Sequence, residues 1–205
     1  MHVRGAIAAA ALVILVLVGG AATYRSVFPA RPGGGVLAHG EMSFAQARAA
    51  EFPVYYGGDF SAELPLRVVL QGENSGPVDD IDFVYGDCHA TSEQGCAPPV
   101  EVQIWPACVR NLTMYAPSGP APLPRALLPV QATVRGVPAA FFEEFHRLEL
   151  QTGISTIVIF GRGYDDVVRI AQGLRGLNVN VGPRVPLPPP SPAALAGKLS
   201  CAGLK

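Results

Sequence analysis

The clearest β-hairpin signal is "RLELQTGISTIVIFG" (residues 147–161), in which two strand-forming runs flank Thr152-Gly153 at the turn. The clearest helix signal follows at once in "YDDVVRIAQGLRG" (164–176). Its apolar residues recur with the i, i+3, i+4, i+7 spacing of one helix face, and these are Val167, Ile170, Ala171 and Leu174. Gly176 is the expected C-cap. A hairpin joined to an amphipathic helix predicts a helix packed on an antiparallel sheet.

A short N-terminal helix is expected, followed by further strands on both sides of a Pro-rich loop at residues 116–129. Residues 81–86 and 100–105 alternate cleanly between apolar and polar side chains and are good candidates to pair antiparallel. "MSFAQARAAEF" predicts a short helix, with Ser43 and Gln46 as a capping box. The remaining strand-like segments are 53–57, 66–71 and 130–136, while 139–145 fits a helical turn or a strand. We therefore expect an α+β fold, with a mostly antiparallel sheet of about six to eight strands and helices packed on one face.

The N-terminus carries an export or membrane signal. Residues 5–23 contain 19 consecutive uncharged residues, long enough for a transmembrane helix. The short basic start at Arg4 and the small residues Gly20 and Ala22 also fit a cleavable signal peptide. Both readings of residues 1–23 stay open: a membrane anchor or a signal peptide.

Four domain segments follow from this pattern. Residues 24–40 form a flexible, glycine-containing linker, residues 41–182 the extracytoplasmic α+β domain, and residues 183–205 a Pro-rich tail expected to be extended rather than packed. All four cysteines lie after the apolar span, and an even number suits an oxidising compartment. The expected location is the cell membrane, single-pass with the C-terminal domain outside, or secreted if residues 1–23 are cleaved.

The cysteines suggest disulfides rather than a metal or redox centre. "GDCHATSEQGCAPPVEVQIWPAC" (86–108) has neither the tight C-x2–4-C knuckle of zinc sites nor the C-x-x-C of thioredoxin-like sites. Pairing of strands 81–86 and 100–105 brings Cys88 and Cys96 to one end and leaves Cys108 for Cys201. That is the favoured pairing, although four cysteines allow three.

Other motifs favour structural roles. The G-x-G of "FGRGYDD" (160–166) resembles a phosphate loop, but Asp165 or Asp166 is expected to cap the helix. The acids Asp79, Asp80, Asp82 and Asp87 are expected in solvated turns rather than a calcium site. Trp105 is expected in the core or against a disulfide.

No catalytic motif is present. His146 has no visible nucleophile to activate, and neither G-x-S-x-G nor H-E-x-x-H occurs. A net charge of −1 gives no electrostatic footprint for nucleic acid. We expect no cofactor and no catalytic or metal residue.

The segments "FVYGDC", "GCAPPVEVQIWPAC" and "LELQTGISTIVIFG" resemble uncharacterised exported or membrane-anchored proteins of actinobacteria, over roughly residues 50–178. The Ala, Gly, Arg and Pro bias is typical of a bacterial, GC-rich source. This resemblance implies no activity.

The leading hypothesis is a non-catalytic domain that binds a protein or cell-envelope component. The alternatives are an envelope hydrolase in which His89 or His146 meets an acid with a perturbed pKa, or a carrier of an apolar ligand.

Overall fold

In the computed structural model, the described residues belong to one compact unit, residues 38–205. The described ranges are 40–58, 64–71, 80–86, 89–91, 95–112, 129–143 and 146–204. The predicted N-terminal span and most of the linker therefore lie outside the described residues.

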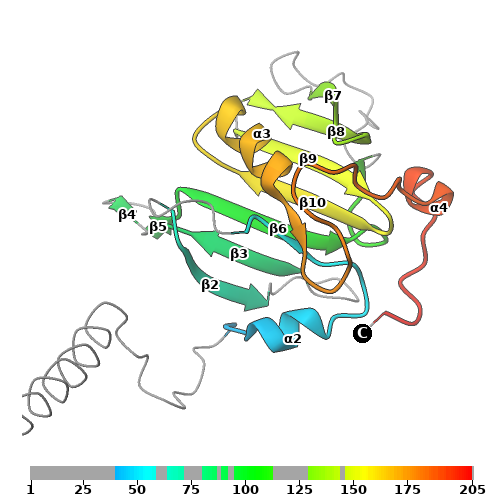
Figure 1. Cartoon of the computed structure of the whole chain (residues 1–205), viewed down its shortest axis with the longest axis horizontal. Coiled ribbons are helices and arrows are strands. Elements are labelled where there is room, and N and C mark those ends of the chain that lie inside the picture. Colours follow the sequence, from blue (N-terminus) through cyan, green and yellow to red (C-terminus); the bar gives the residue numbers. More distant parts are fainter. Residues whose placement is uncertain are drawn as a thin grey trace, which may run out of the picture. The chain divides into compact units, whose positions relative to one another are not determined.

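A seven-stranded antiparallel sheet forms the centre of the fold, in the order β2-β3-β6-β10-β9-β8-β7 (Figure 1). Its strands are β2 (Leu66–Gln71), β3 (Ile81–Tyr85), β6 (Val100–Pro106), β7 (Val130–Val134), β8 (Val137–Phe142), β9 (Arg147–Thr152) and β10 (Ser155–Phe160). The predicted α+β class is confirmed. The ambiguous segment 139–145 contributes to a strand, β8, which its two neighbours in the sheet hold in place.

The predicted hairpin is β9–β10, with Ser155 paired to Thr152 and Phe160 to Arg147. Because Thr152 pairs with Ser155, the turn residues are Gly153 and Ile154, one residue further along than expected. Gly153 has φ 55°, a conformation that glycine adopts without steric cost. β6 pairs antiparallel with β3, as expected for residues 81–86 and 100–105. β6 also pairs with β10, which the sequence did not predict. The strongest sequence signals thus occupy the middle of the sheet.

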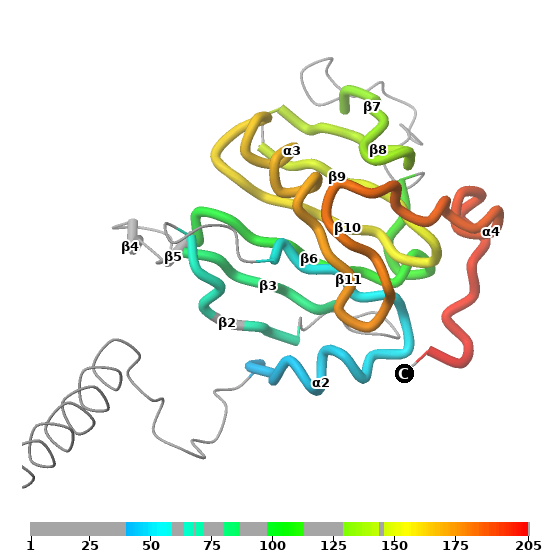
Figure 2. The backbone as a smooth tube through the Cα atoms, in the orientation of Figure 1, coloured from blue at the N-terminus to red at the C-terminus, as the bar shows by residue number. Residues whose placement is uncertain are grey.

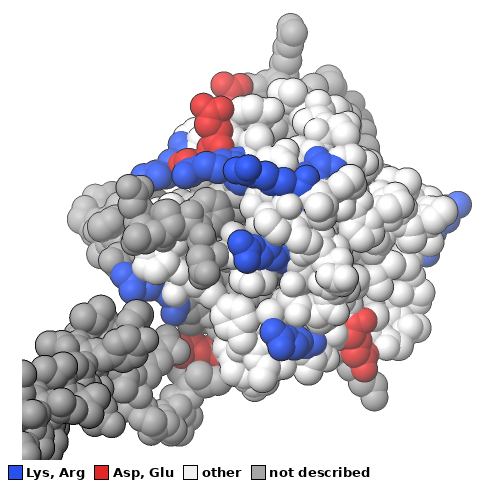
Figure 3. Space-filling view, viewed as in Figure 1, with Lys and Arg blue, Asp and Glu red and all other residues white. Residues whose placement is uncertain are grey.

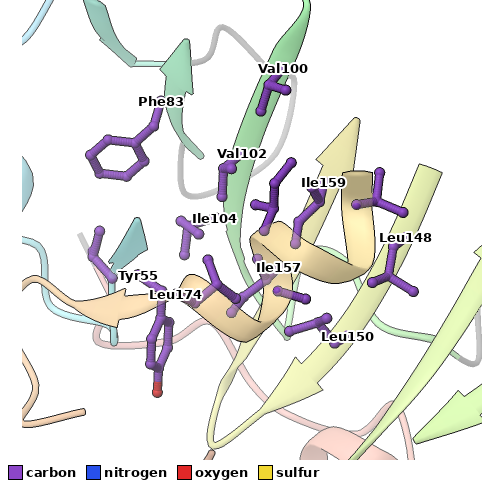
Figure 4. Close-up of a cluster of buried hydrophobic side chains, with 14 of the residues drawn as sticks. Tyr55, Phe83, Val100, Val102, Ile104, Leu148, Leu150, Ile157, Ile159 and Leu174 are labelled. Carbon is purple, nitrogen blue, oxygen red and sulfur yellow. The ribbon is translucent and has the colours of Figure 1, made fainter. Parts of the chain in front are cut away.

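Helix α3 (Tyr164–Gly173) covers one face of the sheet and buries Val167, Ile170 and Ala171. Figure 4 shows side chains of Ile157, Leu150 and Leu174 in the layer between the helix and the strands, and all three are fully buried. Burial of such a side chain contributes about 1.5–3 kcal/mol, so this layer is the main source of stability.

The ends of α3 differ from the prediction. Gly163, rather than an aspartate, is the N-cap residue, and Asp165 and Asp166 lie within the first turn, where they complement the helix dipole. The helix ends at Gly173, and Gly176 instead belongs to β11 (Arg175–Gly176), which pairs with β1 (Tyr55–Tyr56). The C-cap residue is Leu174, two residues before the expected cap, and the chain enters the pairing with β1 directly after it.

Helix α2 (Phe44–Arg48) has the predicted capping box between Ser43 and Gln46. Ala47 is buried in the core, and the ring of Phe44 lies 6.0 Å from that of Phe83, on the sheet face that α3 also covers. A further small ribbon pairs β4 (His89–Thr91) with β5 (Gly95–Ala97). Helices α2 and α3 therefore pack on the same face of the sheet.

The C-terminal segment is packed, which the proline content did not predict. It contains helix α4 (Pro192–Leu195), capped by Ser191, and it buries Leu187 and Ala194. Gly153 in the β9–β10 turn exchanges backbone hydrogen bonds with Pro188 and Ser191. Figure 2 shows the chain leaving α3 through β11 and then continuing to α4. The expectation of an unpacked tail is wrong, because these local bonds hold it against the hairpin.

Candidate functional site

An open hollow of about 680 Å³ lies at the C-terminal end of α3. Its volume is in the range of small-ligand sites. The described residues that line it come from α3, β11, the end of β1 and the turn near residue 183: Gly57, Arg169, Gln172, Gly173, Arg175, Pro183 and Arg184. Arginine is the only charged residue type in this lining. On the face viewed in Figure 3, basic side chains form a band and separate spots, with few acidic side chains between them.

Arg135, in the β7–β8 turn, connects the chain segments that carry the lining residues. Its guanidinium donates to the carbonyl oxygens of Leu174 at 2.8 Å, Ala171 at 3.3 Å, Gly182 at 2.6 Å and Val185 at 2.6 Å. The first two acceptors belong to the end of α3, and the other two flank the turn that carries Arg184. Burial lowers the pKa of Arg135, but arginine stays protonated in proteins.

The backbone of Arg135 has a positive φ of 51°, and the next residue, Gly136, has φ 84°. Two central residues with positive φ match the turn type that two-residue hairpins favour. A non-glycine residue there costs about 1 kcal/mol or more. The four side-chain hydrogen bonds offset that cost, which gives a physical reason for arginine at this position.

Arg184 also has a left-handed backbone, with φ 61°. Its backbone N–H donates to the carbonyl oxygen of Gln172 at 2.8 Å, which fixes the turn against α3. Arg175 lies over Gly58, where an added Cβ would lie 3.1 Å from its Nε. Gly58 has φ 69°, so both its conformation and its missing side chain make room for Arg175.

The charges of the hollow are unbalanced. Arg169 forms an ion pair of 2.8 Å with Asp166, which also pairs with Arg162 at 3.0 Å. Burial raises the pKa of Asp166, but hydrogen bonds with these two arginines outweigh that effect and the pKa is lowered. No described carboxylate forms a salt bridge with Arg175 or Arg184, although both are exposed.

The C-terminal end of a helix normally repels anions, because its last carbonyl groups carry partial negative charge. Here Arg135 occupies the carbonyl oxygens of Ala171 and Leu174, and the Arg184 N–H occupies that of Gln172. The negative end of α3 is therefore compensated by hydrogen-bond donors. The remaining positive charge of Arg175 and Arg184 makes the hollow suited to an anion.

The opposite face of the sheet carries a second polar group. Glu149 is fully buried and binds Arg110 at 2.6 Å and Arg147 at 2.9 Å. Arg147 lies 4.2 Å from the centre of the Phe142 ring, and Arg110 lies 5.3 Å from that of Trp105. Glu149 is thus paired with two arginines, and an aromatic ring lies against each of them. We interpret this cluster as structural.

A carboxyl group with a perturbed pKa lies on the same face. Burial, together with the neighbouring carboxylates of Asp80 and Glu101, raises the pKa of Asp82 to about 8. A hydrogen bond with Asp80 also favours the protonated form, while Oδ1 of Asp82 is buried without a partner. Asp80 is 3% exposed and Asp82 lies within β3, so the expectation of a solvated turn is wrong for both residues. Asp79 and Asp87 lie outside the described residues.

His146 does not lie beside Asp82, the described carboxyl group with the raised pKa. His146 is exposed, directly before β9, and β9 lies three strands from β3 in the sheet order, about 14 Å away at the usual strand spacing. It therefore does not reach Asp82. The side chain of His89 lies outside the described residues.

Trp105 is half-buried on the sheet face opposite α3, where its Nε1 donates to Gln103 at 3.0 Å. The predicted core position is therefore wrong. The outward position of Trp105 follows from the alternation of β6, because Val102 and Ile104 point into the core and the residues between them point away.

The structure contains a disulfide between Cys108 and Cys201, with Cα atoms 5.4 Å apart. Cys88 lies outside the described residues, as does the side chain of Cys96. Within the described part of the chain, no group of three or more His, Cys, Asp or Glu side chains is placed to hold a metal ion.

Sequence reasoning missed the hollow. Its arginines lie in one stretch, 169–184, that carries no recognisable motif, and the hollow takes shape where that stretch folds back through the turn at Arg184 and pairs with β1. One usable signal was Arg135-Gly136 between two strand-like runs, which marks a turn with an unusual residue at its first position.

Comparison of the chain with protein-family models, with curated proteins and with solved structures found no match. Among the described residues, no helix has the length and apolar character needed to cross a bilayer. Function is therefore argued from the geometry of the site.

Proposed function

We propose that residues 38–205 form an extracytoplasmic, non-catalytic binding domain that holds an anionic cell-envelope component in the arginine hollow. The observation that carries this proposal is the exposure of Arg175 and Arg184 in one hollow, with no described carboxylate paired to either. The apolar run of residues 5–23 and the Cys108–Cys201 disulfide support a location outside the cytoplasm.

The chemistry of the lining supports binding rather than catalysis. Its described side chains are arginine, glutamine and proline, with glycine backbone between them, and none is a nucleophile or a general base at neutral pH. Three guanidinium groups at one opening also disfavour an apolar ligand.

The test is isothermal titration calorimetry with the full-length chain in non-ionic detergent at low ionic strength. The ligands are orthophosphate, tripolyphosphate, citrate and triglutamate. We expect at least one to bind, and the double variant Arg175→Ala/Arg184→Ala to lose that binding. Arg48→Ala removes an exposed arginine on α2, outside the hollow, and should bind like the wild type. Absence of binding by all four ligands would contradict the proposal.

Hydrolysis is the second candidate, and a specific observation favours it. A carboxyl group that stays protonated near neutral pH can act as a general acid, and Asp82 has a pKa of about 8 beside Asp80. This candidate predicts turnover of an ester, peptide or glycan by the full-length chain, and loss of that turnover in Asp82→Asn. Turnover that survives in Asp82→Asn would exclude Asp82 as the acid.

A further inference from the structure

We infer that the ligand of the arginine hollow is a linear chain of phosphate groups that contacts Arg175 and Arg184 together. This inference rests on the proposed function and names its ligand class. Both arginines line the same hollow, one from β11 and one from the turn at residues 183–184. A ligand with several anionic groups can contact both at once.

The size of the hollow favours an extended ligand. Its volume of about 680 Å³ would hold about twenty water molecules, whereas a single phosphate has only five heavy atoms. A lone orthophosphate would contact one guanidinium and leave most of the hollow filled with water. Several linked phosphates fill more of it and present acceptor oxygens to both arginines.

The backbone groups of the hollow disfavour a peptide ligand. Peptide recognition in extended form depends on main-chain hydrogen bonds. The N–H of Gly57 already donates to the hydroxyl of Tyr85 at 2.8 Å, and that of Arg184 donates to the Gln172 carbonyl. Neither N–H remains for a peptide carbonyl, so recognition falls to the side chains.

The side chains of the lining favour phosphate chemistry. No aromatic residue is among the described lining residues, so no platform for stacking a base or a sugar ring is present there. Each guanidinium offers five N–H donors in a planar fork that matches phosphate oxygens. Gln172 is the one neutral polar side chain of the described lining, and it can donate or accept.

The ion pair of Arg169 provides a third contact. Its partner, Asp166, is also held by Arg162, and surface pairs of this kind are weak. A phosphate group near Arg169 can therefore accept hydrogen bonds from its guanidinium, while Asp166 stays paired with Arg162. Arg175 and Arg184 remain the primary contacts, because no described acid competes for them.

The experiment compares the affinities of orthophosphate, tripolyphosphate and triglutamate for the full-length chain by calorimetry at one ionic strength. We expect tripolyphosphate to bind at least about tenfold more tightly than orthophosphate, and more tightly than triglutamate. Arg175→Ala and Arg184→Ala should each reduce the tripolyphosphate affinity to near that of orthophosphate. Arg175→Lys should give an intermediate loss, because lysine keeps the charge but not the fork.

Arg48→Ala is the matched control, since it also removes one positive charge. If it weakens tripolyphosphate binding as much as Arg175→Ala does, the effect is one of net charge and the inference is overturned. Equal affinities for orthophosphate and tripolyphosphate would also overturn it, as would tighter binding of triglutamate. Equal affinities for the two phosphates, or tighter binding of triglutamate, leaves the proposal of an anion-binding hollow standing. An equal effect of Arg48→Ala contradicts that proposal as well, which also fails if citrate and all the other anions do not bind.

Discussion

The guanidinium of Arg135 donates a hydrogen bond of 2.8 Å to the carbonyl oxygen of Leu174, and so ties the β7–β8 turn to the end of α3. The same side chain holds Gly182 and Val185, which flank the turn that carries Arg184. One residue therefore connects the sheet, the helix and the rim of the hollow.

Replacement of Arg135 by alanine is expected to cost about 3 kcal/mol or more of unfolding free energy, because several carbonyl groups lose their donor. Arg135→Lys should be almost as destabilised as Arg135→Ala, because an ammonium group does not reproduce the planar set of donors of a guanidinium. Urea denaturation measures both variants. Arg48→Ala, which is exposed, should stay within about 0.5 kcal/mol of the wild type. If Arg135→Ala lowers the free energy of unfolding by no more than Arg48→Ala does, the hydrogen bonds of Arg135 do not organise this region.

Glu149→Gln is expected to destabilise the domain by about 3–5 kcal/mol, because it leaves Arg110 and Arg147 without their buried counter-charge. The measurement is the midpoint of chemical denaturation. Glu143→Gln changes an exposed glutamate and serves as the control. Equal midpoints for the two variants would contradict the structural role of Glu149.

The raised pKa of Asp82 predicts a dependence of stability on pH. A carboxyl group with a folded-state pKa near 8, above its unfolded value of about 3.9, stabilises the fold at low pH, and this contribution is lost as the pH rises through 8. The free energy of unfolding should fall by an amount on the order of 2–4 kcal/mol between pH 5 and pH 9.

Asp82→Asn should remove most of this slope and be more stable than the wild type at pH 9, since an amide has no proton to lose. Asp165→Asn, at an exposed position, should keep the wild-type slope. Retention of the full slope in Asp82→Asn would assign the pH dependence to another group.

Removal of the disulfide by Cys108→Ser/Cys201→Ser is expected to cost about 4–5 kcal/mol on the chain-entropy model, because the bond closes a loop with a sequence separation of 93. Thermal unfolding of the wild type and of the double variant measures the difference. Proteolysis should also release the segment after Gly182 faster in the variant. Equal rates would show that the backbone bonds of Gly153 hold this segment without the disulfide.

Gly58→Ala should weaken tripolyphosphate binding, because the new Cβ would lie 3.1 Å from Nε of Arg175 and displace that side chain. It should also cost about 1 kcal/mol of stability from its φ of 69°. Gly203→Ala is the control, since Gly203 also has a positive φ but no atom within 4 Å of an added Cβ. Both variants should lose stability, and only Gly58→Ala should lose affinity.

The parts of the fold that could be predicted are those with strong local patterns. The alternation in 81–86 and 100–105, the run 147–161 and the helical spacing of 164–176 each correspond to elements that pair or pack with their chain neighbours. Ser43 and Gln46 interact three residues apart, so their capping box also followed from sequence.

The parts that could not be predicted depend on contacts between distant residues. The end of α3 at Gly173 is set by β1, more than a hundred residues earlier, and not by the glycine that looked like a cap. The burial of Asp80 and Asp82 depends on the strands beside them. Arg175 and Arg184 carry no shared motif, because the hollow that they line exists only after the helix, β1–β11 and the turn have assembled.

The packed C-terminal segment also constrains the order of folding. Gly153 bonds to Pro188 and Ser191, Arg135 to Val185, and Cys108 is linked to Cys201. The central strands precede these partners in the chain, so they can pair with one another before residues 185–201 have been synthesised. The domain therefore finishes folding only once residues 185–201 are available, and oxidation of Cys108 with any other cysteine before then would have to be reversed to reach the native state.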